Sequence, residues 1–449
     1  MKTLPDKFVS RMQSLLGEEY SLFEQAVNDS PVRGFRVNTD KISIAVFDKI
    51  NPFGSEKIPY VENGYYLDYQ KIGNHPYHHA GIVYVQEPAA MAPAECLDIN
   101  PDWRILDMCA APGGKSSQLK NKLGEKGILV SNEIIMNRCK ILTGNLERLG
   151  LKNCVTTCMD SSFLAASFPN EFDMIMVDAP CSGEGMFRKD DIAIEEWSEE
   201  NVLKCAERQK EILNNASLCL KDGGYIIYAT CTFSLNENEM VVDSFLKEHP
   251  DFELLPVNER IAKYTSDGVS FKNCYCNNLK LCRRFYPHKG RGEGQFMALL
   301  HSTACVIPES SKRSVTVKEN KLAIEFLNDT LTDFDKKSVF VNGQRVYIMS
   351  PEYCSDAPAF SCGVTVGEIR KNYILPHHQF FSAFGNTFKR RINLSVNSDA
   401  LKNYLHGEEF ETECENGWAV VMVDGCAVGG VKVSNGMAKN HYPKGLRTF

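Results

Sequence analysis

Two cysteines stand directly after buried, strand-like runs of the sequence, where a thiol could act on a ligand. Cys181 follows FDMIMVDAP, and Cys231 follows YIIYAT. If these two strands are neighbours in a parallel sheet, both thiols face one pocket at the carboxyl ends of the strands. A lone cysteine is more often a small buried residue, but two at matching strand ends, beside Asp178, favour covalent chemistry.

A glycine-rich turn, MCAAPGGKSSQL at residues 108–119, follows the strand-like run WRILD. Gly114, Lys115 and Ser116 match the end of the phosphate-binding pattern Gly-x-x-x-x-Gly-Lys-[Ser/Thr], but Cys109 stands where that pattern requires its first glycine. The Gly-x-Gly-x-x-Gly pattern of a dinucleotide site is absent too. Gly113 and Gly114 let the backbone approach a ligand closely and turn sharply into a helix. The turn therefore indicates a nucleoside site without a triphosphate.

Two acidic residues complete this nucleoside site. Glu133 ends the strand-like run GILVSNE, where a carboxylate can accept hydrogen bonds from two ribose hydroxyls, and Asp160 follows VTTCM, where it could bind an adenine amino group. A thiol, a carboxylate and a nucleoside cofactor together suit methylation of carbon 5 of cytosine. A thiolate that adds to carbon 6 makes carbon 5 nucleophilic enough to accept a sulfonium methyl group, once the base has left its stack.

In this chemistry Asp178 would serve nitrogen 3 of the ring, and the second thiol would help to eliminate the first. The reacting thiol must ionise near neutral pH, so its pocket should lower the thiol pKa. The residues alone do not decide whether Cys181 or Cys231 attacks.

The elements that must position these residues follow a regular order. Alternating strand and helix patterns over residues 76–300 predict a parallel, doubly wound α/β sheet. Helical spacing is clear over 135–149, and Gly150 then ends the helix. Ser234 and Glu237 have the spacing of a capping box for a later helix.

Composition narrows the class of protein further. With 43% hydrophobic residues the 449-residue chain can bury a full core, and its net charge of −7 means that nucleic acid would need a local basic groove. No run of about 18 apolar residues and no signal-peptide core are present. We therefore expect a cytoplasmic protein without membrane contact, whose 17 cysteines are free thiols.

Changes in character along the chain predict four domains. We expect an N-terminal RNA-binding domain over residues 1–75, a catalytic domain over 76–305, a mixed connecting domain over 318–385 and a strand-rich domain over 386–449. The polar stretch 303–320 indicates a linker.

These motifs resemble those of a known family, the Nol-Nop-Sun RNA cytosine-5 methyltransferases. The matching segments are DMCAAPGGK at 107–115, DAPCSGEGMFR at 178–188, YATCTFS at 228–234, FRVNT at 35–39 and QEPAA at 86–90. The tail from Gly425 to Arg447 is similar to the PUA-like RNA-binding extension of the bacterial RsmF branch, which modifies small-subunit ribosomal RNA. The resemblance covers most of the chain.

The resemblance implies a Rossmann-like core that binds S-adenosylmethionine. It implies that Cys231 is the nucleophile and that Cys181 assists release of the product. It argues against the opposite order, in which Cys181 attacks, as in DNA cytosine methyltransferases with a Pro-Cys motif. The residues implied to line the cofactor site are Cys109, Ala110, Ala111, Pro112, Gly113, Gly114, Lys115, Glu133, Arg138, Asp160 and Asp178.

Three groups of polar and basic residues are candidate RNA surfaces, since arginine beside aromatic rings suits backbone contact and base stacking. They are Arg36 with Asn38, Arg283 and Arg284 with Lys289 and Arg291, and Lys389 with Arg390 and Arg391. No metal is expected, because the histidines within 75–79 and the cysteines within 274–282 lack the paired spacing of zinc ligands.

The sequence thus predicts an RNA cytosine-5 methyltransferase that acts as a monomer on ribosomal RNA, with the small ribosomal subunit or its precursor as partner. The same chemistry on transfer RNA stays open. A non-catalytic RNA-binding or ribosome-assembly factor would be expected to lack a thiol or the cofactor acid. A small-molecule methyltransferase would have no use for the basic clusters and the extra C-terminal domains.

Overall fold

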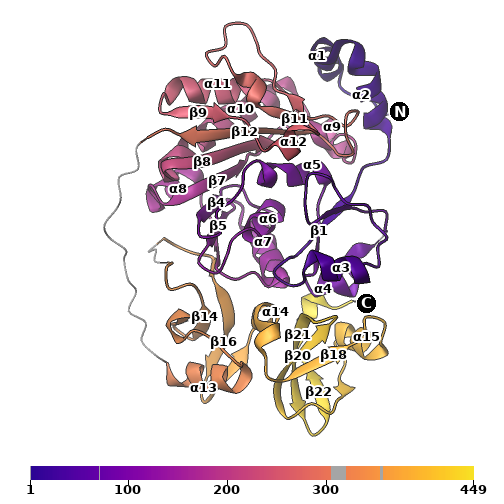
Figure 1. The fold of residues 1–449 in the computed structure, drawn as a ribbon, viewed down its shortest axis with the longest axis vertical. Helices are drawn as coiled ribbons and strands as arrows, with labels where there is room; N and C mark the ends of the chain where they lie inside the picture. The colour runs from indigo at the N-terminus through magenta and orange to yellow at the C-terminus, as the bar shows by residue number, and fades with distance from the viewer. Residues whose placement is uncertain (1, 70, 305–319, 354–356, 449) are drawn as a thin grey trace.

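The computed structural model describes residues 2–69, 71–304, 320–353 and 357–448, and these residues form four sheets. Figure 1 shows the large sheet above, the two C-terminal sheets below, and the N-terminal sheet that contains β1 close to the yellow C-terminal sheet. The predicted linker at 303–320 lies almost entirely outside the described residues.

The centre of the large sheet is parallel and doubly wound, which confirms the predicted fold class. Its five parallel strands have the order β8-β7-β4-β5-β6. They are β4 (Arg104–Asp107), β5 (Ile128–Asn132), β6 (Cys154–Thr157), β7 (Phe172–Asp178) and β8 (Leu220–Thr230). The order reverses between β4 and β7, so the ligand crevice of such a sheet lies where these two strands end.

Helices cover both faces of this sheet because successive strand residues point to opposite faces. On β4, Ile105 packs in the core that contains Leu119 and Leu142, whereas Leu106 packs in the core that contains Leu164 and Leu213. The helices involved are α6 (Gly114–Lys120) and α7 (Met136–Leu149) on one face, and α8 (Ser161–Ser167), α10 (Glu199–Cys219) and α11 (Glu239–Glu248) on the other.

Antiparallel strands extend the sheet at both edges. Beyond β8 lie β12 (Gln295–Ser302), β11 (Arg283–Phe285) and β10 (Ser266–Asp267), and β9 (Phe252–Leu255) pairs with β12. At the opposite edge β15 (Ser361–Cys362) pairs with β6, so a segment beyond residue 318 completes the large sheet. The short helix α12 (Glu259–Ala262) joins β9 to β10, and the short helix α9 (Asp191–Glu195) lies between β7 and α10.

The N-terminal region begins with two amphipathic helices, α1 (Asp6–Leu16) and α2 (Tyr20–Asn28). A three-stranded antiparallel sheet follows, and its last strand lies past residue 75. This region contains β1 (Gly34–Val37), α3 (Ile44–Ile50), β2 (Gly64–Tyr66), α4 (Pro76–His79), β3 (Val83–Val85) and α5 (Pro88–Met91).

Two further sheets follow in the C-terminal region. The first has four antiparallel strands, β13 (Val339–Asn342), β14 (Arg345–Ile348), β16 (Val364–Arg370) and β17 (Tyr373–Pro376). The helix α13 (Lys321–Thr330) precedes these strands, and α14 (His378–Phe384) follows them. The second has five strands, β18 (Arg391–Leu394), β19 (Phe410–Glu411), β20 (Gly417–Val423), β21 (Cys426–Ser434) and β22 (Met437–Asn440). The helix α15 (Asp399–His406) connects β18 to β19.

The five-stranded sheet shares one hydrophobic core with the N-terminal region. Phe35 and Phe47 belong to the same buried cluster as Tyr404 and Val421. The ammonium of the half-buried Lys41 donates hydrogen bonds to the carbonyl of Ser382, at 2.7 Å, and to that of Ala427, at 3.3 Å. The two ends of the chain are therefore packed together across the molecule.

One local prediction is wrong. The helix α11 begins at Glu239, one turn later than the predicted capping box requires. The Glu237 carboxylate does not cap this helix, because it accepts hydrogen bonds from Ser182, on a loop 55 residues away. The Ser234 hydroxyl is buried and has no hydrogen-bond partner among the described residues.

We expect His378 in α14 to make stability depend on pH. Burial, followed by the charges of His377, Lys41, His441 and His79, lowers the pKa of His378 to about 3. Between pH 6.5 and 3 the unfolded chain therefore binds a proton that the folded chain does not, and stability falls as pH falls through this range. In His378→Phe the loss of unfolding free energy between pH 7 and 5 should be about 2 kcal/mol smaller than in the wild type.

Urea unfolding at the two pH values measures this difference. His406→Gln is the control, because His406 is exposed at the end of α15. An equal pH dependence in His378→Phe and the wild type would contradict the assignment of a buried neutral histidine.

Candidate active site

The structure brings the two predicted thiols together. The strands β7 and β8 are parallel neighbours, so the loop after β7 and the residue after β8 meet at one edge of the sheet. The Sγ atoms of Cys181 and Cys231 lie 3.3 Å apart, at hydrogen-bond distance for sulfur. Both cysteines are partly exposed, which leaves them accessible to a ligand.

An ion pair stands beside the thiols. The Lys115 ammonium donates a hydrogen bond of 2.7 Å to the Asp178 carboxylate, and the two side chains are 9% and 33% exposed. Burial alone would lower the pKa of Lys115, but the charge and hydrogen bond of Asp178, together with the charges of Asp107 and Cys231, leave this pKa above its ordinary value. The cofactor turn and the thiol loop are thus joined by one charged contact.

The two thiols ionise unequally. The hydrogen bond from Cys181 lowers the pKa of Cys231, and the charges of Lys115 and Lys189 lower it further, against burial and Asp178. The same hydrogen bond, together with burial, raises the pKa of Cys181 well above its ordinary value. Of the two thiols, Cys231 is therefore the one that ionises more readily.

The glycine-rich turn has little room for side chains. Gly113 has φ of 108°, in the left-handed region, and a Cβ atom there would lie 3.2 Å from Leu142 Cδ1. A Cβ atom on Gly114 would lie 3.1 Å from the side chain of Gln86. At the head of the turn, burial raises the pKa of the Cys109 thiol, so this cysteine stays protonated.

Acidic groups border the turn at the ends of β4 and β5. Asp107 is fully buried, its Oδ2 accepts a hydrogen bond of 2.6 Å from Ser116, and its Oδ1 has no partner among the described residues. Burial raises the pKa of Asp107 to about 7. The buried Glu133 lies 3.4 Å from Arg138, which donates a hydrogen bond of 3.0 Å to the carbonyl of Ala111. Arg138 thus links the turn to Glu133.

The structure gives Asp160 a local role as well. Its carboxylate is exposed and caps α8, because it accepts hydrogen bonds from the Phe163 amide, at 2.8 Å, and the Ser162 hydroxyl, at 2.7 Å. One further residue of the turn, Pro112, accepts a hydrogen bond of 2.9 Å at its carbonyl from Asn145.

The first candidate RNA surface must be corrected. Arg36 is only 1% exposed, and its guanidinium donates hydrogen bonds to Gln86, to the Gly114 carbonyl and to the Ser117 hydroxyl. Asn38 is also buried, and it donates to the carbonyls of Gly81 and Leu149. These side chains face inward from β1, so Arg36 supports the cofactor turn and contributes no RNA surface.

Parts of the other two basic groups are also engaged inside the protein. Arg284 is buried and forms a two-pronged ion pair with Glu239, which corrects its prediction as an RNA contact. Arg283 is largely covered and is hydrogen-bonded to Thr265 at 2.9 Å.

The third basic group stays on the surface in part. Arg390 pairs with Asp329 at 3.0 Å and is mostly covered. Lys389 and Arg391 are exposed. The Lys389 ammonium donates to the carbonyl of Asn328 at 2.6 Å.

Three residues that hold this site were not predicted to do so. Gln86 lies against Gly114 and binds Arg36, Glu184 accepts a hydrogen bond of 3.1 Å from the Phe233 amide, and Glu237 binds Ser182. Gln86 and Glu184 lie inside two of the family motifs, QEPAA and DAPCSGEGMFR, and that position is the only feature of the sequence that could have marked them. Glu237 carried the misleading signal of a capping box.

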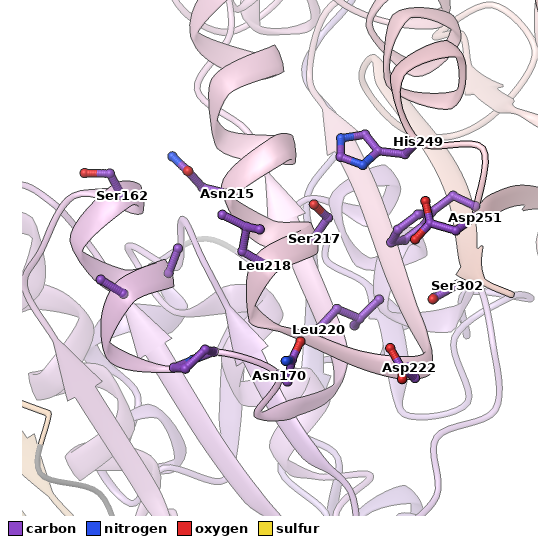
Figure 2. A pocket seen from close by; sticks show the side chains of 14 residues that line it. Ser162, Asn170, Asn215, Ser217, Leu218, Leu220, Asp222, His249, Asp251 and Ser302 are labelled. Atoms are coloured by element: carbon purple, nitrogen blue, oxygen red, sulfur yellow. The ribbon is translucent and has the colours of Figure 1, made fainter. Parts of the chain in front are cut away.

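A separate cavity of about 590 Å³ lies at the opposite end of the strands, near Leu220, where β8 begins. Figure 2 shows Asn215, His249 and Asp251 around it, and none of the predicted site residues lines it. No three histidine, cysteine or acidic side chains in the described residues are grouped so that they could hold a metal ion. No helix in the described ranges is long and apolar enough to cross a membrane.

The fold is that of a Rossmann-like methyltransferase. A crystal structure titled as a methyltransferase homolog protein from Pyrococcus horikoshii superposes with a TM-score of 0.59 and 30% identity, over 66% of this chain and 95% of that one. The switch in strand order between β4 and β7 places the ligand crevice beside the thiols.

The chain belongs to the RsmB/F methyltransferase family. The family described as 16S rRNA methyltransferase RsmB/F matches residues 94–301, the N-terminal domain of 16S rRNA methyltransferase RsmF matches 4–88, and the methyltransferase RsmF PUA domain matches 391–448.

Two curated relatives carry the name ribosomal RNA small subunit methyltransferase F. The Klebsiella pneumoniae protein is 33% identical over 68% of this chain and 65% of its own length. The Vibrio vulnificus protein is 28% identical over 99% of this chain and 97% of its own length.

We expect Arg36→Met to weaken the binding of S-adenosylmethionine, the cofactor that the sequence predicts, by about tenfold, because the Gly114 carbonyl loses its buried donor. Asn38→Leu is the matched control. Asn38 directly follows β1 and is also buried, but it donates to the carbonyls of Gly81 and Leu149 and does not contact the turn. Isothermal titration calorimetry gives both affinities. Unchanged cofactor affinity in Arg36→Met, with weakened RNA binding instead, would contradict the supporting role.

Proposed function

We propose that the protein methylates carbon 5 of cytosine in small-subunit ribosomal RNA and uses S-adenosylmethionine as the methyl donor. The observation that carries the proposal is the 3.3 Å separation of the Cys181 and Cys231 sulfur atoms at the ends of two neighbouring strands. The names of the Klebsiella and Vibrio relatives support ribosomal RNA as the substrate.

The residues at the crevice suit the proposed cofactor. Close packing against Leu142 and Gln86 favours glycine at both positions of the turn, and Asp107 presents a buried oxygen without a partner among the described residues. Residues 109–115, Glu133, Arg138, Asp160 and Asp178 would hold S-adenosylmethionine. When bound, it supplies a methyl group on a positively charged sulfur, which the activated carbon 5 accepts while the sulfur becomes a neutral thioether.

Cys231 is the nucleophile of the proposed reaction. Its thiolate donates an electron pair to carbon 6 of cytosine, and nitrogen 3 takes up a proton from solvent. The Asp178 carboxylate can then accept a hydrogen bond from the new N–H group. The base reaches this site only after it leaves its stack.

Cys181 assists release of the product. Once Cys231 is bonded to carbon 6, its sulfur no longer accepts the hydrogen bond from Cys181 and no longer carries a negative charge, both of which raise the pKa of Cys181, so Cys181 can lose its proton to solvent. The Cys181 thiolate then accepts the proton of carbon 5, the double bond between carbons 5 and 6 forms again, and Cys231 leaves as a thiolate. Nitrogen 3 gives up its proton, and each turnover releases one proton to solvent.

The exposed basic residues Lys389 and Arg391 are the remaining candidates for RNA contact in the C-terminal sheet, beside the strand β18. Arg283 is a weaker candidate because its donors are engaged. We further propose that the protein acts as a cytoplasmic monomer on the small ribosomal subunit or its precursor.

Replacement of the two thiols should have different effects. Cys231→Ala should lower methyl transfer by about a thousandfold or more, because no nucleophile remains. Cys181→Ala should accumulate a covalent protein–RNA adduct, detected as a band that survives denaturing electrophoresis. Cys276→Ala, at a half-exposed thiol away from the site, is the control. Normal turnover by Cys231→Ala, or an adduct formed by the double variant, would refute the mechanism.

The substrate is tested by bisulfite sequencing of RNA from cells with and without the gene. We expect at least one protected cytosine in small-subunit ribosomal RNA to lose its protection when the gene is deleted, while transfer RNA stays unchanged. A change confined to transfer RNA would show that the substrate is transfer RNA and would contradict the proposed ribosomal substrate.

A further inference from the structure

We propose that Glu237 is a positioning residue that ties the loops of both thiols together and biases the pair toward a thiolate at Cys231. This inference rests on the proposed function, in which Cys231 attacks and Cys181 assists release. Glu237 lies just before α11 and is fully buried.

Glu237 fixes the loop of Cys181 through the next residue, Ser182. The carboxylate accepts a hydrogen bond of 2.8 Å from the Ser182 amide and one of 2.5 Å from the Ser182 hydroxyl. Gln209 of α10 donates to the same carboxylate at 3.1 Å and to the carbonyl of Pro180 at 3.0 Å. Both neighbours of Cys181 are therefore tied, directly or through Gln209, to one carboxylate.

Glu237 also fixes the loop of Cys231. The Thr232 hydroxyl donates a hydrogen bond of 3.2 Å to the Glu237 carboxylate. It also lies 3.0 Å from the Ser182 hydroxyl. Each thiol is thus followed by a hydroxyl residue bound to the same acid. The separation of the two sulfur atoms depends on this shared contact.

The surroundings hold Glu237 and Cys231 in fixed positions. The Tyr228 hydroxyl donates to the carbonyl of Glu237 at 2.6 Å. Asn238 accepts a hydrogen bond of 2.6 Å from the Thr230 hydroxyl and donates one of 2.9 Å to the carbonyl of Thr232. The residues on both sides of Cys231 are therefore bound by the segment that contains Glu237.

The charge of Glu237 acts on the thiols as well. No lysine or arginine in the described residues forms an ion pair with it, so its charge is balanced by hydrogen bonds alone. After the hydrogen bond to Cys231, burial and the charge of Cys231, the charge of Glu237 raises the pKa of Cys181 further. A proton shared by the pair is thereby held on Cys181.

Glu237→Gln separates charge from shape. The amide oxygen can still accept from the Ser182 amide and Gln209, and the amide nitrogen can donate to the two hydroxyls. We expect the rate of Cys181 alkylation by iodoacetamide to rise about tenfold near pH 7.5, because the nearby negative charge is lost. Methyl transfer should fall about tenfold, because the thiolate is then shared with Cys181.

Mass spectrometry of the two cysteine peptides gives the alkylation rates as a function of pH in the full-length protein. The assay needs neither RNA nor cofactor, so it tests Glu237 even if the proposed substrate is wrong. Glu248→Gln is the control, because Glu248 is an exposed acid at the C-terminal end of the same helix α11. Its alkylation ratio should equal that of the wild type.

A folded Glu237→Gln protein with the wild-type alkylation ratio would overturn the proposal, as would an equal change in Glu248→Gln. If Glu237→Gln fails to fold, Ser182→Ala tests the same contact. It removes one hydrogen bond and keeps the charge, so turnover should fall about fivefold while Cys231 stays the faster thiol. Wild-type turnover in Ser182→Ala would count equally against the positioning role.

Discussion

The site depends on the pairing of β7 with β8, because parallel neighbours bring their carboxyl ends to one edge of the sheet. Asp178 pairs in register with Ala229, two residues before Cys231. The loop that leaves Asp178 then needs only three residues to bring Cys181 to the second sulfur. Two neighbouring elements fix the loops that carry the sulfur atoms. The helix α10 supplies Gln209, and the segment just before α11 supplies Glu237.

Charge at this edge is arranged in sequence across the sheet. The buried Asp107 comes first, the Lys115–Asp178 pair follows, and the thiols come next, with Glu237 behind Cys181. The hydrogen bond from Cys181 lowers the pKa of Cys231, on which the charges of Asp178 and Lys115 act in opposite senses, whereas the charge of Glu237 raises the pKa of Cys181. A nucleophile that must ionise near neutral pH gains from this arrangement without a histidine as general base.

Much of this arrangement could be predicted from the sequence because it follows from strand order. Strands with apolar residues on both faces, separated by helices, imply a doubly wound sheet, and the glycine turn and the thiols then fall at its carboxyl edge. The roles of Arg36 and Glu237 could not be predicted, because each depends on a partner at least 50 residues away. An arginine in a strand has the same local pattern whether it faces solvent or the Gly114 carbonyl.

The inward direction of Arg36 has a consequence for dissecting the protein. The residues that support the cofactor turn come partly from β1, and the sheet that holds β1 shares its core with the last sixty residues of the chain. A fragment trimmed to the Rossmann-like unit would keep both sulfurs but expose the underside of its own glycine turn. Catalytic competence in this architecture is thus a property of the intact polypeptide, and its modules are not independently exchangeable parts.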